Sequence, residues 1–335
     1  MASKDADDGA PLPEVLPGLV GASPKMRVLA RYVTRCAKLP VPVLLRGESG
    51  TGKEAVARAL HTEGPRASGP FVAVSGALLG GDVGLSSLLG HVRGAFTGAA
   101  EPRRGALRRA DGGTLFIDEV GTMSAATQAR LLRVVEDGQC EPLGADHAHP
   151  VDVRLVTATC EPLEAQVKRG RFRFDLYQRI SACVVVLPPV RDRGIRDLEL
   201  IVRHLFRQAP LSGRWITDEA LQLLSRQRWP GNVRELNNVL VHAAMLGESE
   251  CIDASAVIDA LAARGSVGGP HDGRLDAAAI LRAARGNISA AARQAGLPRS
   301  TFRDRLAAAY SDGRVSAGGL NGAPASCVST LACAD

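Results

Sequence analysis

Short apolar runs alternate with amphipathic segments along the first 190 residues of the chain. Five runs are rich in β-branched residues and almost uninterrupted, namely residues 42–47, 70–76, 113–119, 152–160 and 181–189. Such runs are typical of strands that are buried on both faces of a sheet. The segments between them have helical periodicity, so the alternation predicts an α/β fold with a parallel sheet.

Two of the predicted helices have clear ends. Ser23 precedes Pro24, and this pair predicts a helix that begins there and runs to about residue 38. Ser124 and Gly138 flank a second apolar stripe as its N-terminal cap and closing glycine.

The pattern changes after residue 193, where the strands stop and residues 196 to about 263 look all-helical. We therefore expect six parts along the chain. They are a disordered N-terminus (1–18), an α/β subdomain (19–190), a helical subdomain (191–263), a glycine-rich linker (264–274), a short helical domain (275–310) and a disordered tail (311–335).

Composition narrows the class of protein. The 335 residues include 45% hydrophobic ones, enough for a well-buried core, and the net charge of +6 is compatible with a nucleic-acid partner without being evidence for one. Seven cysteines show neither CxxC pairs nor regular spacing, so we expect reduced thiols in a cytoplasmic protein rather than disulfides or a zinc site. No apolar run reaches the roughly 20 residues of a membrane span, and no membrane partner is expected.

A glycine-rich turn, "GESGTGKE", lies between a predicted strand and a predicted helix. Its spacing matches the phosphate-binding loop, in which backbone N–H groups and a lysine cradle the phosphates of a nucleotide. The candidate residues are Gly47, Glu48, Ser49, Gly50, Thr51, Gly52, Lys53 and Glu54. The alternative is a glycine-rich turn with a chance lysine, which the flanking strand and helix make the weaker interpretation.

The run "GGTLFIDEV" ends in two carboxylates, Asp118 and Glu119. Beside a phosphate loop, Asp118 is suited to hold Mg²⁺ and Glu119 to polarise the attacking water. The alternative is a strand that simply ends in acidic residues.

Five motifs occur in a fixed order, namely "GESGTGKE", "GAFTGA", "DGGTLFIDEV", "GRFRFDLYQRI" and "WPGNVRELNNV". Over roughly residues 19–310 the chain resembles the bacterial enhancer-binding proteins, the AAA+ activators of sigma-54 RNA polymerase. The resemblance implies a P-loop ATPase with a helical lid over 191–263, using ATP and Mg²⁺. It also implies that Glu54, where other phosphate loops have Ser or Thr, is normal for the family.

The resemblance assigns further roles. Residues Gly94, Ala95, Phe96, Thr97, Gly98 and Ala99 form a loop that grips the sigma factor, with Phe96 as an exposed apolar tip on a glycine hinge. Arg173 and Arg179 are expected to reach the ATP of a neighbouring subunit, which implies a ring, expected to be a hexamer. Thr159 and Arg234 are expected to contact the nucleotide. Without the resemblance, Phe96 would be assigned to a local core and the arginines to an ordinary surface.

Three departures from the family pattern bear on activity. Ser75 stands where an asparagine is expected to restrain the catalytic glutamate, and Cys160 replaces an asparagine in the first sensor. Ser87 and Val92 replace two glutamates before the grip loop. Slow hydrolysis or altered coupling is therefore an open alternative.

The segment 275–310 has the layout of a helix-turn-helix, with Asn287 as a helix cap and Gly296 at the turn. It resembles a Fis-like DNA-binding domain. The residues expected to contact double-stranded DNA are Arg299, Ser300, Thr301, Arg303 and Arg305. The alternative is a helical cap with a solvated basic face.

Together these features predict an ATP-dependent transcription activator. It would bind an upstream DNA site, assemble a ring and remodel sigma-54 RNA polymerase holoenzyme to open promoters. With only about 18 residues before the ATPase, we expect its control to come from outside the chain. Two alternatives stay open, a DNA-binding regulator with a weakened or lost ATPase, and a remodelling ATPase that acts on another partner.

Overall fold

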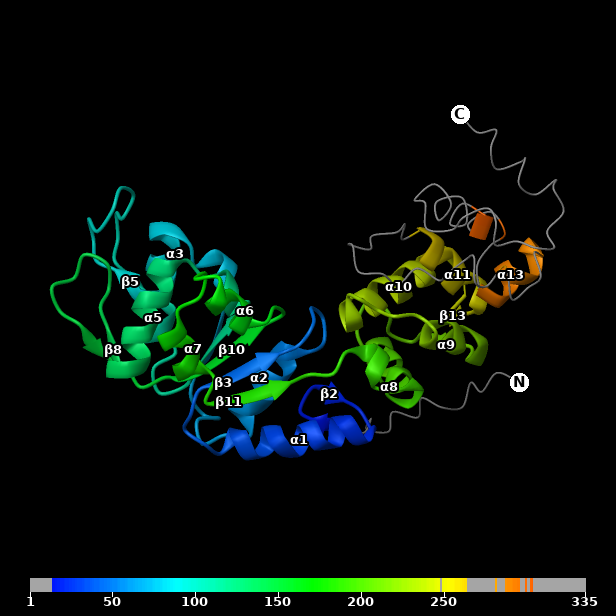
Figure 1. Ribbon diagram of the computed structural model, residues 1–335, viewed down its shortest axis with the longest axis horizontal. Coiled ribbons are helices and arrows are strands. Elements are labelled where there is room, and N and C mark those ends of the chain that lie inside the picture. The colour runs from blue at the N-terminus through cyan, green and yellow to red at the C-terminus, as the bar shows by residue number, and fades with distance from the viewer. Residues whose placement is uncertain are drawn as a thin grey trace. The chain divides into compact units, whose positions relative to one another are not determined.

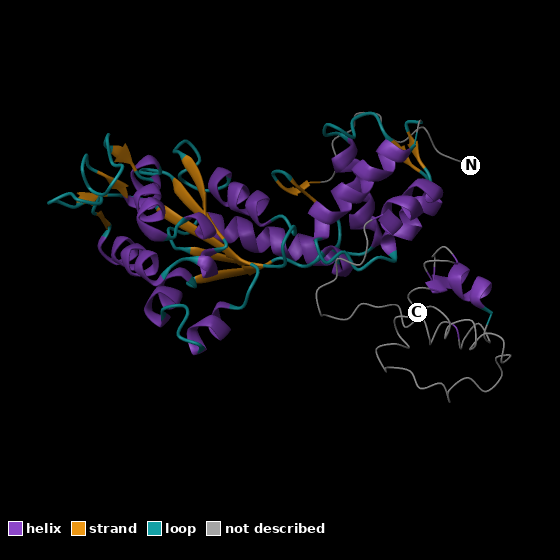
Figure 2. Cartoon of the chain, turned by 90° about the horizontal axis from the view of Figure 1, so that it is seen from above, coloured by secondary structure: helices purple, strands orange, loops and turns teal. Residues whose placement is uncertain are grey.

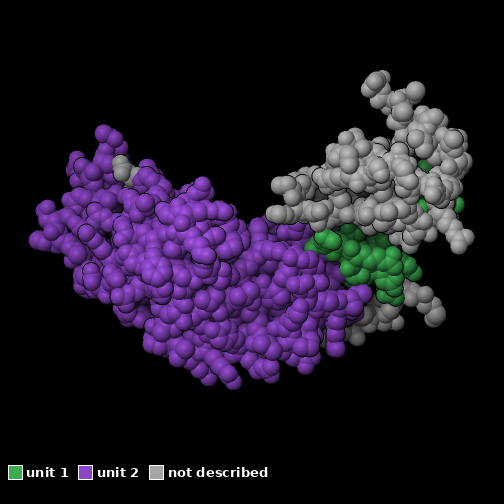
Figure 3. All heavy atoms as spheres, in the orientation of Figure 1, with its two compact units in different colours: residues 1–3, 209–228, 238–335 green, residues 4–208, 229–237 purple. Residues whose placement is uncertain are grey.

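The computed structural model describes residues 14–247, 249–263, 281, 287–295, 299 and 302–303. Its contacts divide the chain into two compact units, which Figure 3 shows in two colours. The sheet unit comprises Lys4–Gln208 with Trp229–Asn237, and the helical unit comprises Met1–Ser3, Ala209–Arg228 and Asn238–Asp335.

The sheet unit is built around five parallel strands in the order β11-β3-β10-β7-β4. The strands are β3 (Val43–Arg46), β4 (Phe71–Ser75), β7 (Thr114–Asp118), β10 (Arg154–Thr159) and β11 (Cys183–Val186). All five apolar runs of the sequence therefore become neighbours in one sheet, and the predicted parallel α/β sheet is confirmed.

Alternating side chains of these strands fill two hydrophobic cores, one on each face of the sheet. Along β3, Val43 and Leu45 pack into the core that includes α1 (Pro24–Ala37) and α2 (Lys53–Thr62), whereas Leu44 packs into the other. All three side chains are fully buried. A strand with apolar neighbours on both faces gains from every position, which explains its uninterrupted apolar sequence.

Helices cover both faces of the sheet, as Figure 2 shows. α1 begins after Ser23, whose hydroxyl accepts a hydrogen bond from Met26 N, and α5 (Ala125–Asp137) begins after Ser124 and ends at Gly138. Both predicted helices are confirmed together with their caps. The remaining helical segments of this unit are α3 (Gly81–Leu89), α4 (Ala106–Arg109), α6 (Leu163–Lys168), α7 (Phe174–Ile180), α8 (Ile195–Phe206) and the short η1 (Gly76–Leu78), η2 (Val120–Thr122) and η3 (Val190–Asp192).

Two hairpins extend the sheet unit at its edge (Figure 1). One pairs β5 (Gly90–His91) with β6 (Arg103–Arg104), and the other pairs β8 (Gln139–Cys140) with β9 (His149–Pro150). Their strands contain two residues each, too few to leave a periodic signal in the sequence.

The N-terminus departs from the prediction. Residues 1–18 were expected to be disordered, but β1 (Glu14–Leu16) pairs with β2 (Leu19–Val20). Leu16 and Leu19 are buried against the core that holds α1. For residues 14–18 the prediction is wrong, because burial of these leucines outweighs the proline-rich, acidic composition. Residues 1–13 lie outside the described part of the chain.

A buried arginine, Arg154 on β10, links the ends of two helices. Its guanidinium donates to the carbonyls of Cys36 and Ala37, at 2.6 and 2.7 Å, where α1 ends. It also donates to Leu60 O near the end of α2, at 3.0 Å. Burial lowers the pKa of Arg154, and the three carbonyls accept from its two terminal nitrogens, whereas the buried Nε has no hydrogen-bond partner in the described part of the chain. One cation therefore holds the C-terminal ends of both helices.

The helical unit contains α9 (Asp218–Ser225), α11 (Ala254–Ala263) and α13 (Ile288–Ala295). α10 (Asn232–Leu246) begins in the sheet unit and continues into this one. The segment 196–263 was predicted to be all-helical, but β12 (Trp215–Ile216) and β13 (Cys251–Ile252) form a parallel pair. Thr217 N donates to Ile252 O, and a ladder this short gives no sequence signal.

Cysteine pairing also differs from the prediction. Cys36 on α1 and Cys183 on β11 form a disulfide across 147 residues of sequence. The expectation of reduced thiols is wrong for this pair, since the packing of α1 against β11 brings together two cysteines whose spacing is uninformative. Cys140, Cys160 and Cys251 are free, and the remaining two, at 327 and 333, lie outside the described residues.

Only part of the predicted C-terminal domain is described. Asn287 caps α13, because its side chain accepts from Ala290 N at 3.0 Å, as the sequence predicts. The predicted linker 264–274, the turn at Gly296 and the tail 311–335 lie outside the described residues. Among the helices that the structure describes, none is long and apolar enough to cross a membrane.

Candidate nucleotide-binding site

The phosphate-loop sequence lies where β3 ends and α2 begins. Gly50 and Gly52 have φ values of +74° and +100°, in the left-handed region where glycine is favoured. A Cβ at Gly50 would collide with the carbonyl of Gly231, so the close approach of two backbones also requires glycine there. The loop therefore presents backbone N–H groups at the N-terminus of a ten-residue helix, an arrangement that attracts anions.

Lys53 lies at the first position of α2 and is only 7% exposed. Its ammonium donates to the carbonyls of Gly47 and Glu48, at 2.9 and 3.3 Å, and lies 3.8 Å from Glu119 Oε1. The ammonium therefore lies against the carbonyls of the loop, where it could meet an anion bound there.

The two predicted carboxylates lie at the end of β7, with Asp118 as its last residue and Glu119 directly after it. Burial and the charge of Glu119 raise the pKa of Asp118, while Lys53 opposes this shift. A carboxylate whose charge is disfavoured in this way is a fitting ligand for a cation. Glu119 has φ 51° and ψ 50°, an uncommon backbone conformation for a residue other than glycine.

Glu119 contacts the residue that replaces the expected sensor asparagine. Cys160, just after β10, donates to Glu119 Oε2 through its backbone N–H at 3.3 Å and its thiol at 3.2 Å. Burial, followed by the Glu119 hydrogen bond, raises the pKa of the thiol to about 11, so it is protonated at neutral pH.

The first turn of α10 holds the phosphate loop from outside. Val233 N donates to Gly50 O at 3.0 Å, and Arg234 Nη1 donates to Ser49 Oγ at 2.9 Å. The buried Asn232 donates to Ser49 O and to the Glu48 carboxylate, at 3.0 and 3.1 Å. Residues more than 180 apart in sequence therefore fix the loop.

The loop and its surroundings enclose a cavity of about 320 Å³. Eight predicted residues line it, namely Ser49, Gly50, Thr51, Gly52, Lys53, Glu54, Asp118 and Arg234. Gly47, Glu48, Glu119 and Thr159 do not line it. The Thr159 side chain bonds Glu161 O, and its carbonyl accepts from Gly47 N, so it supports the loop from behind.

The side of this cavity opposite the phosphate loop was not predicted from the sequence. That side is formed by Gly18, Leu19 and Val20 of the first hairpin and by Arg193, Ile201, His204, Leu205 and Gln208 in and around α8. Arg193 is buried and donates to Thr51 O at 2.6 Å, and burial lowers its pKa to about 10. No motif marks these residues in the sequence.

Residues 19–186 match the model of the sigma-54 interaction domain, which is about half of the chain. The chain belongs to the sigma-54 interaction domain family. Residues 191–273 match the AAA+ ATPase lid domain. The resemblance to sigma-54-dependent activators is thus confirmed, as is an AAA+ P-loop ATPase fold with a central parallel sheet and a helical lid.

Named relatives agree with this family. The chain is 44% identical over 246 residues to the Nif-specific regulatory protein of Klebsiella pneumoniae, covering 72% of this chain and 47% of that protein. It is 43% identical over 263 residues to the DNA-binding transcriptional regulator NtrC of a Bradyrhizobium species, covering 78% and 54%. The chain therefore spans about half the length of the curated relatives it matches.

A solved structure of NtrX from Brucella abortus in complex with ATP is also similar. It shares 33% identity with a TM-score of 0.63, and the match covers 86% of this chain and 68% of that one.

The two predicted trans-acting arginines lie outside the nucleotide cavity. Arg173 pairs with Asp175 at 2.7 Å, and Arg179 pairs with Glu136 at 3.2 Å. The two side chains are 47% and 59% exposed. Neither therefore serves the nucleotide cavity of its own sigma-54 interaction domain.

The predicted grip loop, Gly94–Ala99, lies between β5 and β6. Gly94 N donates to Ala99 O at 2.9 Å, and Gly94 and Gly98 have positive φ with open space around them. Phe96 is half-buried, with its ring edge-on to His91. The expectation of an exposed tip is therefore wrong for this conformation, because the imidazole offers an aromatic surface to Phe96.

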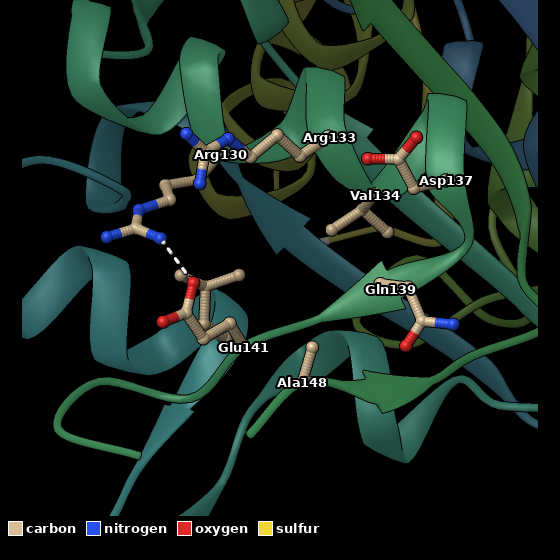
Figure 4. A pocket seen from close by; sticks show the side chains of 8 residues that line it. Arg130, Arg133, Val134, Asp137, Gln139, Glu141 and Ala148 are labelled. Atoms are coloured by element: carbon tan, nitrogen blue, oxygen red, sulfur yellow. Dashed lines mark hydrogen bonds and ion pairs between the residues drawn. The ribbon is translucent and has the colours of Figure 1, made fainter. Parts of the chain in front are cut away.

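A second pocket, of about 170 Å³, lies beside α5 and β8 of the sigma-54 interaction domain (Figure 4). Arg130 and Glu141 form an ion pair of 2.9 Å at this pocket, and Arg133 and Asp137 also line it. Its lining contains none of the glycines or the lysine of the phosphate loop. The larger cavity, which holds the phosphate loop, is therefore the candidate nucleotide site.

Of the predicted DNA-contacting residues, Arg299 and Arg303 are described and are exposed. Ser300, Thr301 and Arg305 lie outside the described residues, and the DNA contact of all five residues stays a prediction.

Proposed function

We propose that this chain is an ATP-dependent activator that hydrolyses ATP and uses the energy to remodel sigma-54 RNA polymerase. The observation that carries the proposal is one cavity that brings together the phosphate loop, the buried Lys53 and the carboxylate of Asp118, with Glu119 beside Lys53. The similarity to NtrX, solved in complex with ATP, supports the nucleotide assignment.

Each residue has a distinct part in the proposed hydrolysis. Backbone N–H groups of the loop and Lys53 bind the β- and γ-phosphates. Arg234, in the first turn of α10, contacts the bound nucleotide and so links it to that helix. Mg²⁺, when bound with ATP, supplies positive charge to the phosphate oxygens, and Asp118 is the residue suited to hold it. Glu119 accepts a proton from water as the water oxygen bonds to the γ-phosphorus and the bond to the bridging oxygen of ADP breaks.

Completion of the site requires a second subunit. Arg173 and Arg179 are exposed, lie outside the cavity of their own chain and would exchange their ion pairs with Asp175 and Glu136 for the ATP of a neighbour in a ring, expected to be a hexamer. A guanidinium delivered to the γ-phosphate stabilises the charge that develops there.

The outputs of the cycle are a protein contact and a DNA contact. Release of Phe96 from His91 would present an apolar side chain to sigma-54, and the hinge glycines at 94 and 98 permit that movement. The C-terminal residues around Arg299 and Arg303 are proposed to bind upstream DNA as a helix-turn-helix.

The test is ATP hydrolysis by the purified chain over a concentration series, beside Lys53→Ala and Arg179→Ala. We expect turnover per subunit to rise with concentration and to be lost in both variants. Mixing the two inactive variants should restore part of the activity, since each supplies what the other lacks at a shared site. Turnover independent of concentration, with Arg179→Ala fully active, would contradict the ring.

A further inference from the structure

The two oxygens of the Glu119 carboxylate have different surroundings. Oε2 accepts two hydrogen bonds, from the backbone N–H and the thiol of Cys160, at 3.3 and 3.2 Å. Oε1 lies on the side of Lys53, whose ammonium is 3.8 Å away. In the described part of the chain, Cys160 is the residue that donates hydrogen bonds to this carboxylate, and Lys53 is its ion-pair partner on the other oxygen.

The main chain at Glu119 is already fixed by other groups. Its carbonyl accepts from the hydroxyl of Thr122 at 2.7 Å and from the N–H of the same residue at 3.0 Å. Gly76 lies directly against this carbonyl, where a Cβ would collide with it. With its backbone held in the left-handed conformation, Glu119 keeps only side-chain torsions, and these decide where the carboxylate points.

Ser75 is the neighbouring polar residue that could have restrained Glu119. It ends β4 and pairs in register with Asp118 on β7. Among the described residues, however, no hydrogen bond joins Ser75 to Glu119. The restraint on the glutamate therefore comes from the end of β10 and not from the end of β4.

We propose that Cys160 is the positioning residue for Glu119, holding Oε2 so that Oε1 is the oxygen that accepts the proton of the attacking water. The inference rests on the proposed ATP hydrolysis and adds to it a residue that acts through Glu119 rather than on the nucleotide. The orientation is built into the chain before the nucleotide binds.

A thiol is suited to this part only while it keeps its proton. Desolvation of the thiol, followed by the hydrogen bond and the charge of Glu119, raises the pKa of Cys160 to about 11, so the thiol is a donor at neutral pH. A thiol is a weaker donor than a hydroxyl, which makes the restraint on Glu119 soft.

The first experiment compares ATP hydrolysis by the full chain and by Cys160→Ala, Cys160→Ser and Cys251→Ala. Cys160→Ala should lower kcat about three- to tenfold with KM within about twofold, as expected for the loss of one hydrogen bond made to a catalytic group. Cys160→Ser keeps a donor and should recover most of kcat. Cys251 lies on β13 in the other unit, so Cys251→Ala is the matched control and should leave kcat unchanged.

The second experiment tests the contact without relying on turnover. Alkylation of Cys160 by iodoacetamide is followed by mass spectrometry in the full chain and in Glu119→Gln. Removal of the negative charge should speed the reaction at Cys160 about tenfold, while Cys251 reacts at the same rate in both proteins.

The outcomes separate this inference from the proposed function. Equal kcat in Cys160→Ala and the unchanged chain, or a change confined to KM, would overturn the positioning role. An alkylation rate that ignores Glu119→Gln would overturn the contact itself. If the unchanged chain has no turnover above Lys53→Ala, the proposed hydrolysis fails and the positioning role with it, whereas a faster reaction in Glu119→Gln would still support the contact.

Discussion

The ring of Phe96 meets the imidazole of His91 edge-on, with 5.0 Å between the ring centroids and an interplanar angle of 67°. Both nitrogens of that imidazole are engaged, Nδ1 with Ser86 Oγ at 2.6 Å and Nε2 with Glu101 O at 2.8 Å. Because a carbonyl only accepts, Nε2 donates and Nδ1 accepts from the serine in the neutral ring. The two hydrogen bonds therefore fix the orientation of the imidazole, and the Phe96 ring packs edge-on against it.

From this contact we predict opposite effects for two substitutions. His91→Ala removes an aromatic pair worth about 0.5–1.5 kcal/mol, so binding of sigma-54 without nucleotide should strengthen about two- to tenfold. Phe96→Ala should abolish that binding while ATP turnover stays within about twofold. Fluorescence anisotropy with labelled sigma-54 measures both.

The control for this pair is Met245→Ala, since Met245 is 75% exposed on α10 and lies outside the loop. Weaker sigma-54 binding by His91→Ala would show that the contact with the imidazole holds Phe96 in the conformation that binds the partner, and would contradict the prediction.

Arg234 supplies the second prediction. Its guanidinium bonds Ser49 in the phosphate loop, and Arg234→Ala should weaken ATP binding about tenfold through loss of a charged donor near the phosphates. Arg234→Lys should recover only part of this, because an ammonium cannot reproduce the planar fork of donors. Titration with a fluorescent ATP analogue gives the dissociation constants of the two variants and of the unchanged chain. Equal affinities in these three proteins would show that Arg234 does not contribute to nucleotide binding.

Gly50 supplies the third prediction, through backbone geometry. Gly50→Ala places a Cβ against Gly231 O in a backbone of positive φ, and should lower the free energy of unfolding by about 1–3 kcal/mol while reducing ATP affinity. Gly80 offers a matched control, since its φ is −96° and its surroundings are open. Urea unfolding should therefore give a clearly lower free energy of unfolding for Gly50→Ala than for Gly80→Ala. An equal loss in both variants would contradict the close contact between Gly50 and Gly231.

The fourth prediction concerns pH. The hydrogen bonds from Arg191 lower the pKa of Glu48, so the folded state favours its ionised form. The stabilisation is complete above the unfolded pKa of 4.5 and is lost as pH falls through the lower folded value. Because both side chains are about 40% exposed, we expect it to be below about 1 kcal/mol.

Glu48→Gln should accordingly unfold at lower urea concentration than the unchanged chain at pH 7, and the two should converge towards pH 3. A gap that is constant over this range would mean that Glu48 acts through packing or its bond to Asn232 instead of through its charge.

The sheet could be predicted because its evidence is local. Val43, Leu44 and Leu45 are adjacent in sequence and all buried, and Ser23 and Ser124 lie next to the helices they cap. The phosphate loop is local in the same way, since its glycines and Lys53 fall within seven residues.

The remainder of the site could not be predicted because it forms only when distant segments meet. Leu19 and Leu205 line one cavity from opposite ends of the sheet unit's sequence, and neither belongs to a motif. Cys160 could be marked as a departure from a family pattern, but its hydrogen bonds to Glu119 depend on the register of β10 beside β7. The disulfide between Cys36 and Cys183 likewise follows from packing and not from spacing.

The arginine that joins the ends of α1 and α2 gives the phosphate loop a mechanical support. Lys53 opens α2 at one end, and Leu60 O is held by Arg154 near the other. The end of α2 that is remote from the loop is anchored through Arg154 to the sheet and to α1. We therefore expect α2 to keep its position when an anion binds at its first turn. Binding of a phosphate at the loop would then move side chains such as those of Arg234 and Ser49 rather than the helix.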